Sequence, residues 1–290
     1  MKKFEKFRMD EKNPKWENAI SRRKKLYSPK FGTDTMRSEF DRDYTRIINC
    51  NAYKRLKGKT QVFFAPDNDH ICTRLEHVNL VESISYTIAN AFGLNAELTK
   101  AISVGHDLGH TPFGHQGERI LNDIAKKEGL EKFWHGRNGL DFVDDYELLK
   151  DYEGVKRNLS LTYAVRDGII GHCGAFPSQG LKPRDEFINI EKEFTLPAQF
   201  MPYTWEACVV KIADNISYIG RDIEDALIQG VLKEKDVEKL DKMIEEIKSI
   251  NSINSTNIIN YLVVDFCNNS NPEVRIKIFF QSIRDNESFN

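Results

Sequence analysis

The stretch from Ala101 to Glu118, AISVGHDLGHTPFGHQGE, constrains the fold most, because one helix must end and another begin within a few residues. Its apolar start is typical of a buried helix. Gly109, Pro112 and Gly114 then interrupt the helix, since proline lacks a backbone donor and glycine tolerates unusual dihedral angles. The pattern predicts two helices joined by a tight turn, with the second helix starting near Gly114.

Polar side chains gather at this turn. His106 and Asp107 close the first helix, and His115 and Glu118 stand at i and i+3 on one face of the second. Histidine is the commonest metal-ligand side chain and exchanges protons near neutral pH. A histidine beside an aspartate offers nitrogen and oxygen to a divalent ion. The alternative is a histidine-rich turn in which these residues only cap helices.

Composition limits the classes of protein. The 290 residues are 40% hydrophobic and 30% charged with a net charge of −2, so they suffice for one large domain or two small ones and give no global attraction to nucleic acid. No apolar run approaches the roughly 18 residues of a membrane span, and the N-terminus lacks a secretory apolar region. The five cysteines are scattered without a CxxC pair, which favours reduced thiols in a cytoplasmic protein.

The periodicity predicts an all-α fold, a helical bundle. Helices are expected over residues 37–57, 75–92, 95–108, 115–128, 141–157, 161–172, 204–229, 233–249 and from 258 onward. A short β-hairpin or extended loop is expected near residues 60–70, where a Val-Phe-Phe run precedes a turn. The segment FWHGRNGL reads as a loop, and residues 174–203 read as a long proline-containing loop of the kind that often serves as a lid or a partner surface.

The longest predicted helix, residues 204–229, carries two stripes. One is apolar. The other is polar and consists of Lys211, Asp214, Tyr218, Arg221, Asp222 and Asp225. A solvent-facing helix shows such a stripe, but the same residues facing inward would line one wall of a site. Both interpretations remain open on the pattern alone.

His77 is a further candidate ligand, because it begins a helix one turn after Arg74. A single histidine at the polar start of a helix is more often structural. The pair would instead present a metal ligand and an anion clamp, since the planar guanidinium of arginine makes paired hydrogen bonds with phosphate.

Together, His77, His106-Asp107 and Asp214 follow the H…HD…D signature of the HD-domain phosphohydrolases. The match extends over three long blocks, RLKGKTQVFFAPDNDHICTRLEH, HDLGHTPFGHQGE and KIADNISYIGRDIEDAL. Through these blocks the chain resembles the dGTPase-like deoxynucleoside triphosphate triphosphohydrolases. The resemblance covers roughly residues 38 to 230.

The resemblance implies one divalent metal ion, bound by His77, His106, Asp107 and Asp214. Nitrogen and oxygen ligands suit Mn²⁺, Mg²⁺, Fe²⁺, Ni²⁺ or Zn²⁺. The implied reaction converts a deoxynucleoside triphosphate (dGTP or dNTPs in general) and water to a deoxynucleoside and inorganic triphosphate. Two alternatives remain: another HD phosphohydrolase, such as a deoxynucleoside 5′-monophosphatase, and a weakly catalytic regulator that binds nucleotides or single strands.

The resemblance also assigns roles to single residues. His115 and Glu118 would be the catalytic pair, Tyr218 would lie under the deoxyribose where a 2′-hydroxyl is excluded, and Asp222 would contact the 3′-hydroxyl. The full set of expected substrate contacts is Gln61, Arg74, His110, His135, Lys211, Tyr218 and Asp222. Within this set Arg74 and Lys211 would neutralise the polyphosphate, His110 and His135 would line it, and Gln61 would face the sugar or the α-phosphate.

Three domains or segments are expected on this basis. Residues 1–35 would be a loosely ordered flank, residues 36–232 the HD phosphohydrolase domain, and residues 233–290 a C-terminal helical extension that is cut short. The expected partners are a deoxynucleoside triphosphate and further copies of the chain, as a dimer or hexamer. Nucleic acid would be a secondary ligand at most, and no membrane contact is expected.

Overall fold

The computed structural model describes residues 2–24, 36–62, 70–151, 153–174, 180–231, 233, 254–273 and 276. In chain order these residues form η1 (Glu5–Phe7), α1 (Trp16–Ala19), α2 (Glu39–Asn49), α3 (Asn51–Arg55), η2 (Leu56–Gly58), α4 (Arg74–Phe92), α5 (Ala96–Gly105), α6 (Gly114–Lys127), α7 (His135–Asp141), the π-helical turn η3 (Phe142–Tyr146), β1 (Leu148–Lys150), β2 (Lys156–Asn158), α8 (Tyr163–Gly171), α9 (Ile190–Glu193), α10 (Trp205–Ile228) and α12 (Ser255–Asn269). The fold is mostly α-helical, which confirms the predicted class.

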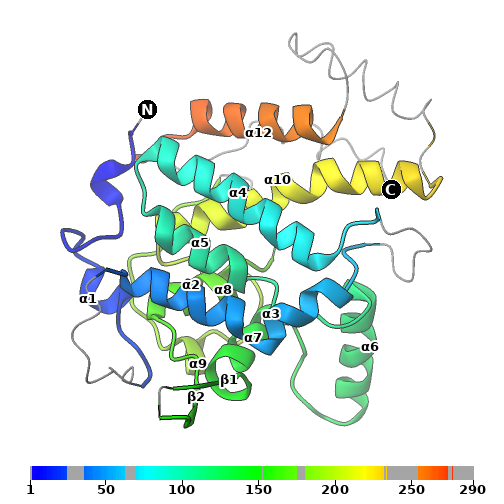
Figure 1. The fold of residues 1–290 in the computed structure, drawn as a ribbon, viewed down its shortest axis with the longest axis horizontal. Helices are drawn as coiled ribbons and strands as arrows, with labels where there is room; N and C mark the ends of the chain where they lie inside the picture. The colour runs from blue at the N-terminus through cyan, green and yellow to red at the C-terminus, as the bar shows by residue number, and fades with distance from the viewer. Residues whose placement is uncertain are drawn as a thin grey trace.

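Helix α5 lies at the centre of the fold (Figure 1), where it packs against α2, α4, α8 and α10. Its apolar residues Leu98, Ala101 and Ile102 are fully buried. Helix α12 lies across α4 and α10 on the other side of the bundle. The C-terminal end of α5 therefore carries His106 and Asp107 into the middle of the protein.

Local sequence sets the ends of α4. The Thr73 hydroxyl accepts from the Glu76 amide while Glu76 accepts from the Thr73 amide, a reciprocal cap that satisfies two free donors. Gly93 ends the helix in the left-handed conformation, at φ 79°. These caps confirm the predicted helix at 75–92. They also set where the helix begins, so Arg74 and His77 lie on its first turn.

The region from Trp134 to Asn158 differs from the prediction. The segment expected to be a loop forms α7, and the helix expected over 141–157 is instead the short η3 turn followed by the antiparallel β1–β2 hairpin. Packing explains the first difference, because Trp134 and Leu140 are buried and a Cβ on Gly109 would lie within 2.2 Å of the Gly139 nitrogen. The hairpin is closed by a turn in which Gly154 has φ 80°.

The N-terminal segment is packed where a loosely ordered flank was expected. Phe4 is fully buried, and its ring lies 4.4 Å from that of Phe92 and 5.1 Å from that of Trp205. Arg22 donates to the buried carboxylate of Asp43 at 2.6 Å. The expectation is thus wrong for residues 2–24, because apolar anchors spaced among the charges bury this segment; residues 25–35 lie outside the described part.

Three further expectations fall partly outside the described residues. An isolated bridge pairs Thr60 with Thr73, but residues 63–69 of the predicted hairpin or extended loop are not described. The charged helix predicted at 233–249 lies outside the described part apart from its first residue. Helix α12 begins at Ser255, three residues before the predicted start, because the Asn254 side chain accepts from the Asn257 amide.

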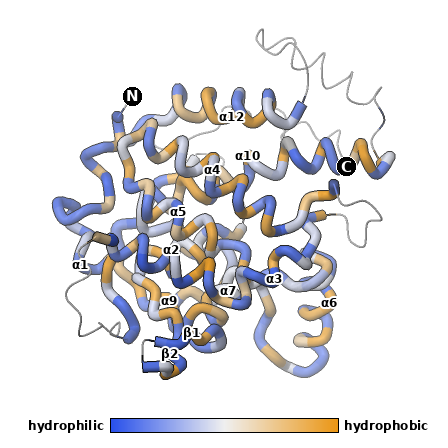
Figure 2. The backbone as a smooth tube through the Cα atoms, viewed as in Figure 1, coloured by the Kyte–Doolittle hydropathy of each residue, from blue (hydrophilic) through white to orange (hydrophobic). Residues whose placement is uncertain are grey.

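Helix α6 stands at the edge of the bundle (Figure 1) and buries only Gly114 and Ala125. Apolar residues show as orange bands along it in Figure 2, and Ile120 and Ile124 are about half exposed. The first turn of α6 contributes to the site described below. Among the described helices, none combines the length and apolarity required to cross a membrane.

Candidate functional site

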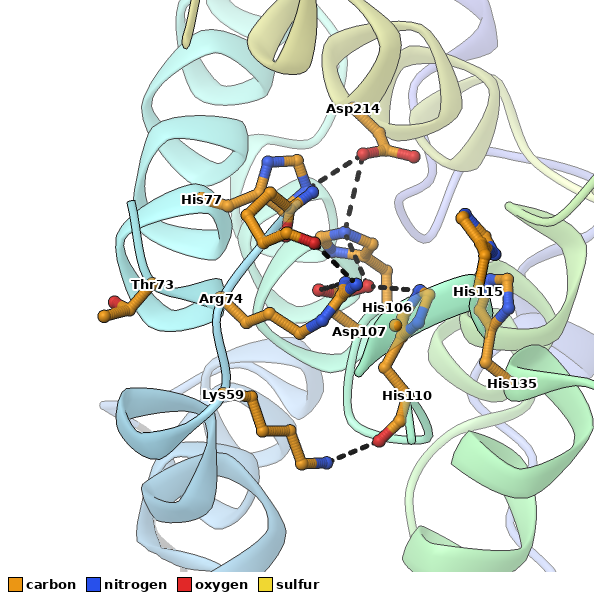
Figure 3. Close-up of polar contacts among 12 residues, drawn as sticks. Lys59, Thr73, Arg74, His77, His106, Asp107, His110, His115, His135 and Asp214 are labelled. Atoms are coloured by element: carbon orange, nitrogen blue, oxygen red, sulfur yellow. Dashed lines mark hydrogen bonds and ion pairs between the residues drawn. The ribbon is translucent and has the colours of Figure 1, made fainter. Parts of the chain in front are cut away.

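Four of the predicted ligands come together from three helices (Figure 3). His77 is on the first turns of α4, His106 and Asp107 follow α5, and Asp214 is on α10. The Nε2 atom of His77 lies 3.0 Å from Oδ1 of Asp214, and ligand atoms of His77, His106 and Asp107 lie within 4.8 Å of one another. His77, His106 and Asp107 are buried. This grouping has the residue types and spacing of a nitrogen-and-oxygen metal site.

The ring of His106 fits such a site. Its Nδ1–H donates to the Ser103 carbonyl at 2.7 Å, because a carbonyl can only accept. The other nitrogen, Nε2, is buried and has no hydrogen-bond partner among the described residues. It lies 3.8 Å from a carboxylate oxygen of Asp107 and 3.8 Å from one of Asp214, too far for hydrogen bonds. A buried lone pair between two carboxylates is the environment a divalent cation requires.

His77 is held in a matching way. The Ser217 hydroxyl donates to the Asp214 carbonyl at 2.7 Å, so its oxygen accepts from the Nδ1–H of His77 at 3.2 Å. Nε2 of His77 therefore faces the Asp214 carboxylate and needs a cation or a proton between them. Burial opposes ionisation of Asp214, but the contact with His77 and the charges of nearby histidines outweigh burial and lower its pKa.

Asp107 is braced on both oxygens. Arg74 donates to Oδ2 at 2.8 Å, and Nε2 of His110 lies 3.0 Å from Oδ1. Burial would raise the pKa of Asp107, yet His110 and Arg74 hold it well below its usual range. Arg74 also donates to the Gln61 carbonyl at 3.3 Å and retains a buried Nε–H without a hydrogen-bond partner. The predicted phosphate clamp thus also orients the proposed metal ligand Asp107.

A second polar group is formed by Glu118, His115 and His135. Its two histidines lie beside the first group (Figure 3). One oxygen of Glu118 lies 3.5 Å from Nδ1 of His115 and only 3.0 Å from Nδ1 of His135. Glu118 therefore serves two histidines, where the sequence suggested only His115. The side chain of His115 is 78% exposed, whereas that of His135 is 14% exposed.

Charge in this group is unevenly shared. Burial would raise the pKa of Glu118, but hydrogen bonds from His115 and His135 lower it below its usual range. Burial disfavours the charged form of His135, but contacts with Cys173 and Glu118 outweigh burial and raise its pKa to about 10. The ring of the neighbouring His110 stacks on that of His135, with the ring centres 3.8 Å apart. Burial lowers the pKa of His110 to about 3. His115 is thus the histidine of this group that remains open to solvent.

Sequence reasoning missed His172 and Cys173, which follow α8. Nε2 of His135 lies 3.0 Å from the Cys173 sulfur, and the His172 ring lies 5.1 Å from that of His106. The available signal was a histidine at a glycine-flanked helix end, the same pattern that marked His106. Lys59 was also missed; its ammonium donates to the His110 carbonyl at 2.5 Å (Figure 3).

Two expected phosphate contacts are corrected. Lys211 is buried, and its ammonium donates to the Gly171, His172 and Cys173 carbonyls at 3.4, 2.7 and 2.7 Å. All three ammonium hydrogens are therefore used in joining α10 to the end of α8. Both ring nitrogens of His135 are likewise engaged within the protein, by Glu118 and Cys173, so this ring is not free to line a phosphate.

The remaining predicted contacts lie on or near α10. Tyr218 and Asp222 are both partly buried, and the Tyr218 hydroxyl donates to Asn215 at 2.8 Å. Asp222 has a buried Oδ1 without a hydrogen-bond partner, and burial raises its pKa to about 6. The Gln61 side-chain oxygen is also buried without a partner. The polar stripe of this helix therefore faces inward at Asp214 and Asp222, which resolves the alternatives that its pattern left open.

Comparisons with known proteins agree with this arrangement. The HD domain family matches residues 74–219, which include all four grouped ligands. Two similar proteins are each called deoxyguanosinetriphosphate triphosphohydrolase-like protein. The one from Caldanaerobacter subterraneus subsp. tengcongensis is 42% identical over 204 residues, which are 70% of this chain and 50% of the relative. The one from Desulfatibacillum aliphaticivorans is 42% identical over 202 residues, which are 70% of this chain and 51% of the relative. The chain spans about half the length of these relatives. Because the family model spans half of the chain, the chain belongs to the HD domain family.

Proposed function

We propose that the protein hydrolyses deoxynucleoside triphosphates to a deoxynucleoside and inorganic triphosphate. The observation that carries the proposal is the buried, partnerless Nε2 of His106 between two carboxylates, set beside an acid–base group on Glu118. The names of the similar relatives support the same substrate class. The proposal includes a homo-oligomer and a cytoplasmic location, as the family resemblance implies.

His77, His106, Asp107 and Asp214 would hold one divalent ion. Bound there, the ion would neutralise phosphate charge and make the α-phosphorus a better electrophile. The carboxylates of Asp107 and Asp214 stay ionised at neutral pH, because their pKa values are lowered. The two carboxylates therefore need no proton loss before they bind the ion, whereas, despite burial, the contact with Asp214 raises the pKa of His77, so the ion would replace a proton at its Nε2.

The chain's own residues would handle the leaving group. Water forms a bond to the α-phosphorus as the bond from that phosphorus to the 5′-oxygen breaks, and the departing oxygen needs a proton. His115 is exposed and is oriented by Glu118 one turn away, so it is suited to donate that proton. The free Nε–H of Arg74 would bind the polyphosphate.

The sugar would lie along α10. Tyr218 and Asp222 follow Asp214 by one and two turns, so they extend along one helix face away from the proposed metal ligands. A phenol ring packed under C2′ leaves no room for a 2′-hydroxyl. The partnerless Oδ1 of Asp222 is available to accept from a 3′-hydroxyl.

The decisive experiment incubates the protein with each of the four dNTPs, with GTP and with dGMP, in Mn²⁺ or Mg²⁺, and separates the products by chromatography. The expected products of dGTP are deoxyguanosine and intact triphosphate. Orthophosphate released from dGMP would instead identify a 5′-monophosphatase. Nucleotide binding without turnover in either metal would overturn the proposal in favour of a binding protein.

A matched pair of variants ties the activity to the site. Asp214→Asn removes one carboxylate charge from the group, so we expect loss of bound metal and of hydrolysis with the helical circular dichroism retained. Asp123→Asn makes the same change on an exposed position of α6 and should behave as the wild type. Equal activity in the two variants would exclude Asp214 from the machinery.

A further inference from the structure

Three side chains outside the HD ligand set converge behind the proposed catalytic group. The Cys173 sulfur lies 3.0 Å from Nε2 of His135 and 3.5 Å from Nε2 of His172. The donor atoms of all three lie within 4.8 Å of one another. Cys173 and His172 are buried, at 4% and 6% exposure. The group is thus an imidazole–thiol cluster in the interior, made by the start of α7 and the end of α8.

The tautomers of both rings are fixed by their second nitrogens. Nδ1–H of His172 donates to the Ile169 carbonyl at 2.6 Å, so its Nε2 carries a lone pair. Nδ1–H of His135 donates to the Glu118 carboxylate at 3.0 Å. Metal-bound histidines usually donate their other N–H to a carbonyl or carboxylate in this way. Both rings are therefore set up as ligands.

With both rings neutral, the hydrogen bonds of the cluster do not balance without a cation. A thiol carries one hydrogen, but two imidazole nitrogens face the Cys173 sulfur. Whichever neutral ring accepts that hydrogen, the other nitrogen keeps a buried lone pair aimed at sulfur, and a second proton, on His135, is the alternative that a cation would replace. A cation satisfies the sulfur and both nitrogens of His135 and His172 together.

The geometry and the surrounding backbone also fit. Zinc bonds of about 2.3 Å to sulfur and about 2.0–2.1 Å to nitrogen, in a tetrahedron, place sulfur and nitrogen about 3.5 Å apart. The two observed separations, 3.0 and 3.5 Å, are close to that value. A Cβ on Gly136 would lie 2.5 Å from the Cys173 sulfur, so glycine there lets α7 approach the thiol. Lys211 fixes the His172 and Cys173 carbonyls from α10.

We propose that His135, His172 and Cys173 form a second metal site, which takes a thiolate-preferring divalent ion such as Zn²⁺. It is distinct in chemistry from the neighbouring HD group, whose four ligands offer only nitrogen and oxygen. A thiolate selects softer ions than carboxylates do. The proposal rests on the geometry of the three side chains and does not require the proposed hydrolysis.

Cobalt provides a test that does not depend on activity. Co²⁺ bound by a thiolate gives an intense sulfur-to-metal charge-transfer absorption, whereas nitrogen and oxygen ligands give only weak bands. The reduced, metal-stripped chain is titrated with Co²⁺, with binding followed by absorption and elemental analysis. We expect the charge-transfer band in the wild type and its removal when Zn²⁺ is added. No such band in the wild type would overturn the proposal.

Variants separate the two sites. Cys173→Ser should lose the band and one Co²⁺ per chain, while Cys267→Ser, a change to a partly exposed cysteine of α12, should keep both. Asp214→Asn should keep the band while losing the HD ion. Persistence of the band in Cys173→Ser, or its loss in Asp214→Asn, contradicts a separate Cys173 site.

One further variant covers the case in which Cys173→Ser fails to fold, as judged by circular dichroism. His172→Asn keeps the thiol and removes one ligand. We expect at least ~10-fold weaker Co²⁺ binding by the charge-transfer titration, because a lost ligand costs at least as much as a lost supporting contact. Unchanged affinity would remove His172 from the site and overturn the proposal as stated.

Discussion

Two histidines that end helices share one local device. His106 follows α5 and His172 follows α8, and each donates Nδ1–H to the carbonyl three residues earlier, that of Ser103 or Ile169. The bond caps a free carbonyl at the helix end. It also fixes the tautomer of the ring, so that Nε2 is the nitrogen available to bind a metal ion. The same short-range hydrogen bond thus both ends the helix and prepares a ligand.

A change at His115 tests the proposed proton donor. His115→Ala should lower kcat by at least ~10²-fold, the usual scale for a positioned acid–base group. Metal content and melting temperature should stay near wild type, because the side chain is 78% exposed. Gln116→Ala, at the next exposed position of α6, is the control and should retain activity. Loss of metal in His115→Ala would make His115 a ligand instead.

A change at Tyr218 tests recognition of the sugar. We expect the wild type to prefer dGTP over GTP by at least ~100-fold in kcat/KM, which corresponds to roughly 2.7 kcal/mol. Tyr218→Ala should shrink the ratio mainly by admitting GTP. Tyr218→Phe keeps the ring and removes the hydroxyl that donates to Asn215, so it should keep the ratio. A lower melting temperature with an unchanged ratio in Tyr218→Ala would show an ordinary packing role.

At the scale of elements, the site depends on how helix ends meet. Helices α5 and α8 both pack against α10, and buried charged side chains anchor α8 to its neighbours. Lys211 of α10 binds the carbonyls at the end of α8, and Arg184 binds Asp167 of α8 at 2.5 Å. A positive charge is favourable at the C-terminal end of a helix, where carbonyls are unsatisfied. These contacts hold His172 and Cys173 in place.

The structural role of Lys211 predicts a stability effect. Lys211→Met keeps the length of the side chain and leaves the Gly171, His172 and Cys173 carbonyls without their donor. We expect a loss of about 1–3 kcal/mol in the free energy of unfolding, measured by urea denaturation. Lys192→Met, at an exposed position of α9, should lose little. If Lys211→Met were as stable as the wild type and only its KM rose, Lys211 would contact the substrate phosphate after all.

At the scale of the whole molecule, folding places many acids in the interior. Asp43 and Asp167 are fully buried, and burial raises the pKa of both despite their arginine partners. Among the described residues, nothing donates a hydrogen bond to the buried Oδ1 of Asp222, and burial raises the pKa of this side chain to about 6. Its ionised form is thus disfavoured by the fold at neutral pH. This free-energy cost of ionisation falls on the carboxylate that, in our proposal, would accept from a substrate hydroxyl.

Asp222 therefore predicts a pH-dependent stability. Its folded-state pKa of about 6 exceeds the ordinary value of 3.8, so the cost of ionisation appears as pH rises from about 4 to about 6 and is complete above that. Asp222→Asn should raise the melting temperature at pH 8, and the gain should vanish by pH 4. Asp123→Asn, at an exposed site, should show no such change. A gain independent of pH would refute the assignment.

Several features followed from local sequence. Thr73, Glu76 and Gly93 are capping residues whose preferences act within a few residues, so the limits of α4 were predictable. The spacing of His106-Asp107 from the glycine and proline residues after it likewise predicted a helix end that offers one nitrogen and one carboxylate. The family signature, H…HD…D, named the four proposed ligands, which the fold brings close together.

Long-range packing decided the rest. No local pattern could show that Lys211 caps α8 from α10, or that Glu118 lies closer to His135 than to His115. The segment FWHGRNGL is helical from His135 onward, and the buried side chains of Trp134 and Leu140 anchor it to the core. Sequence by itself determined the helix ends and the types of ligand, since both depend on neighbouring residues. Tertiary structure alone decided which side chains meet, because contacts between residues far apart in the chain have no local signal.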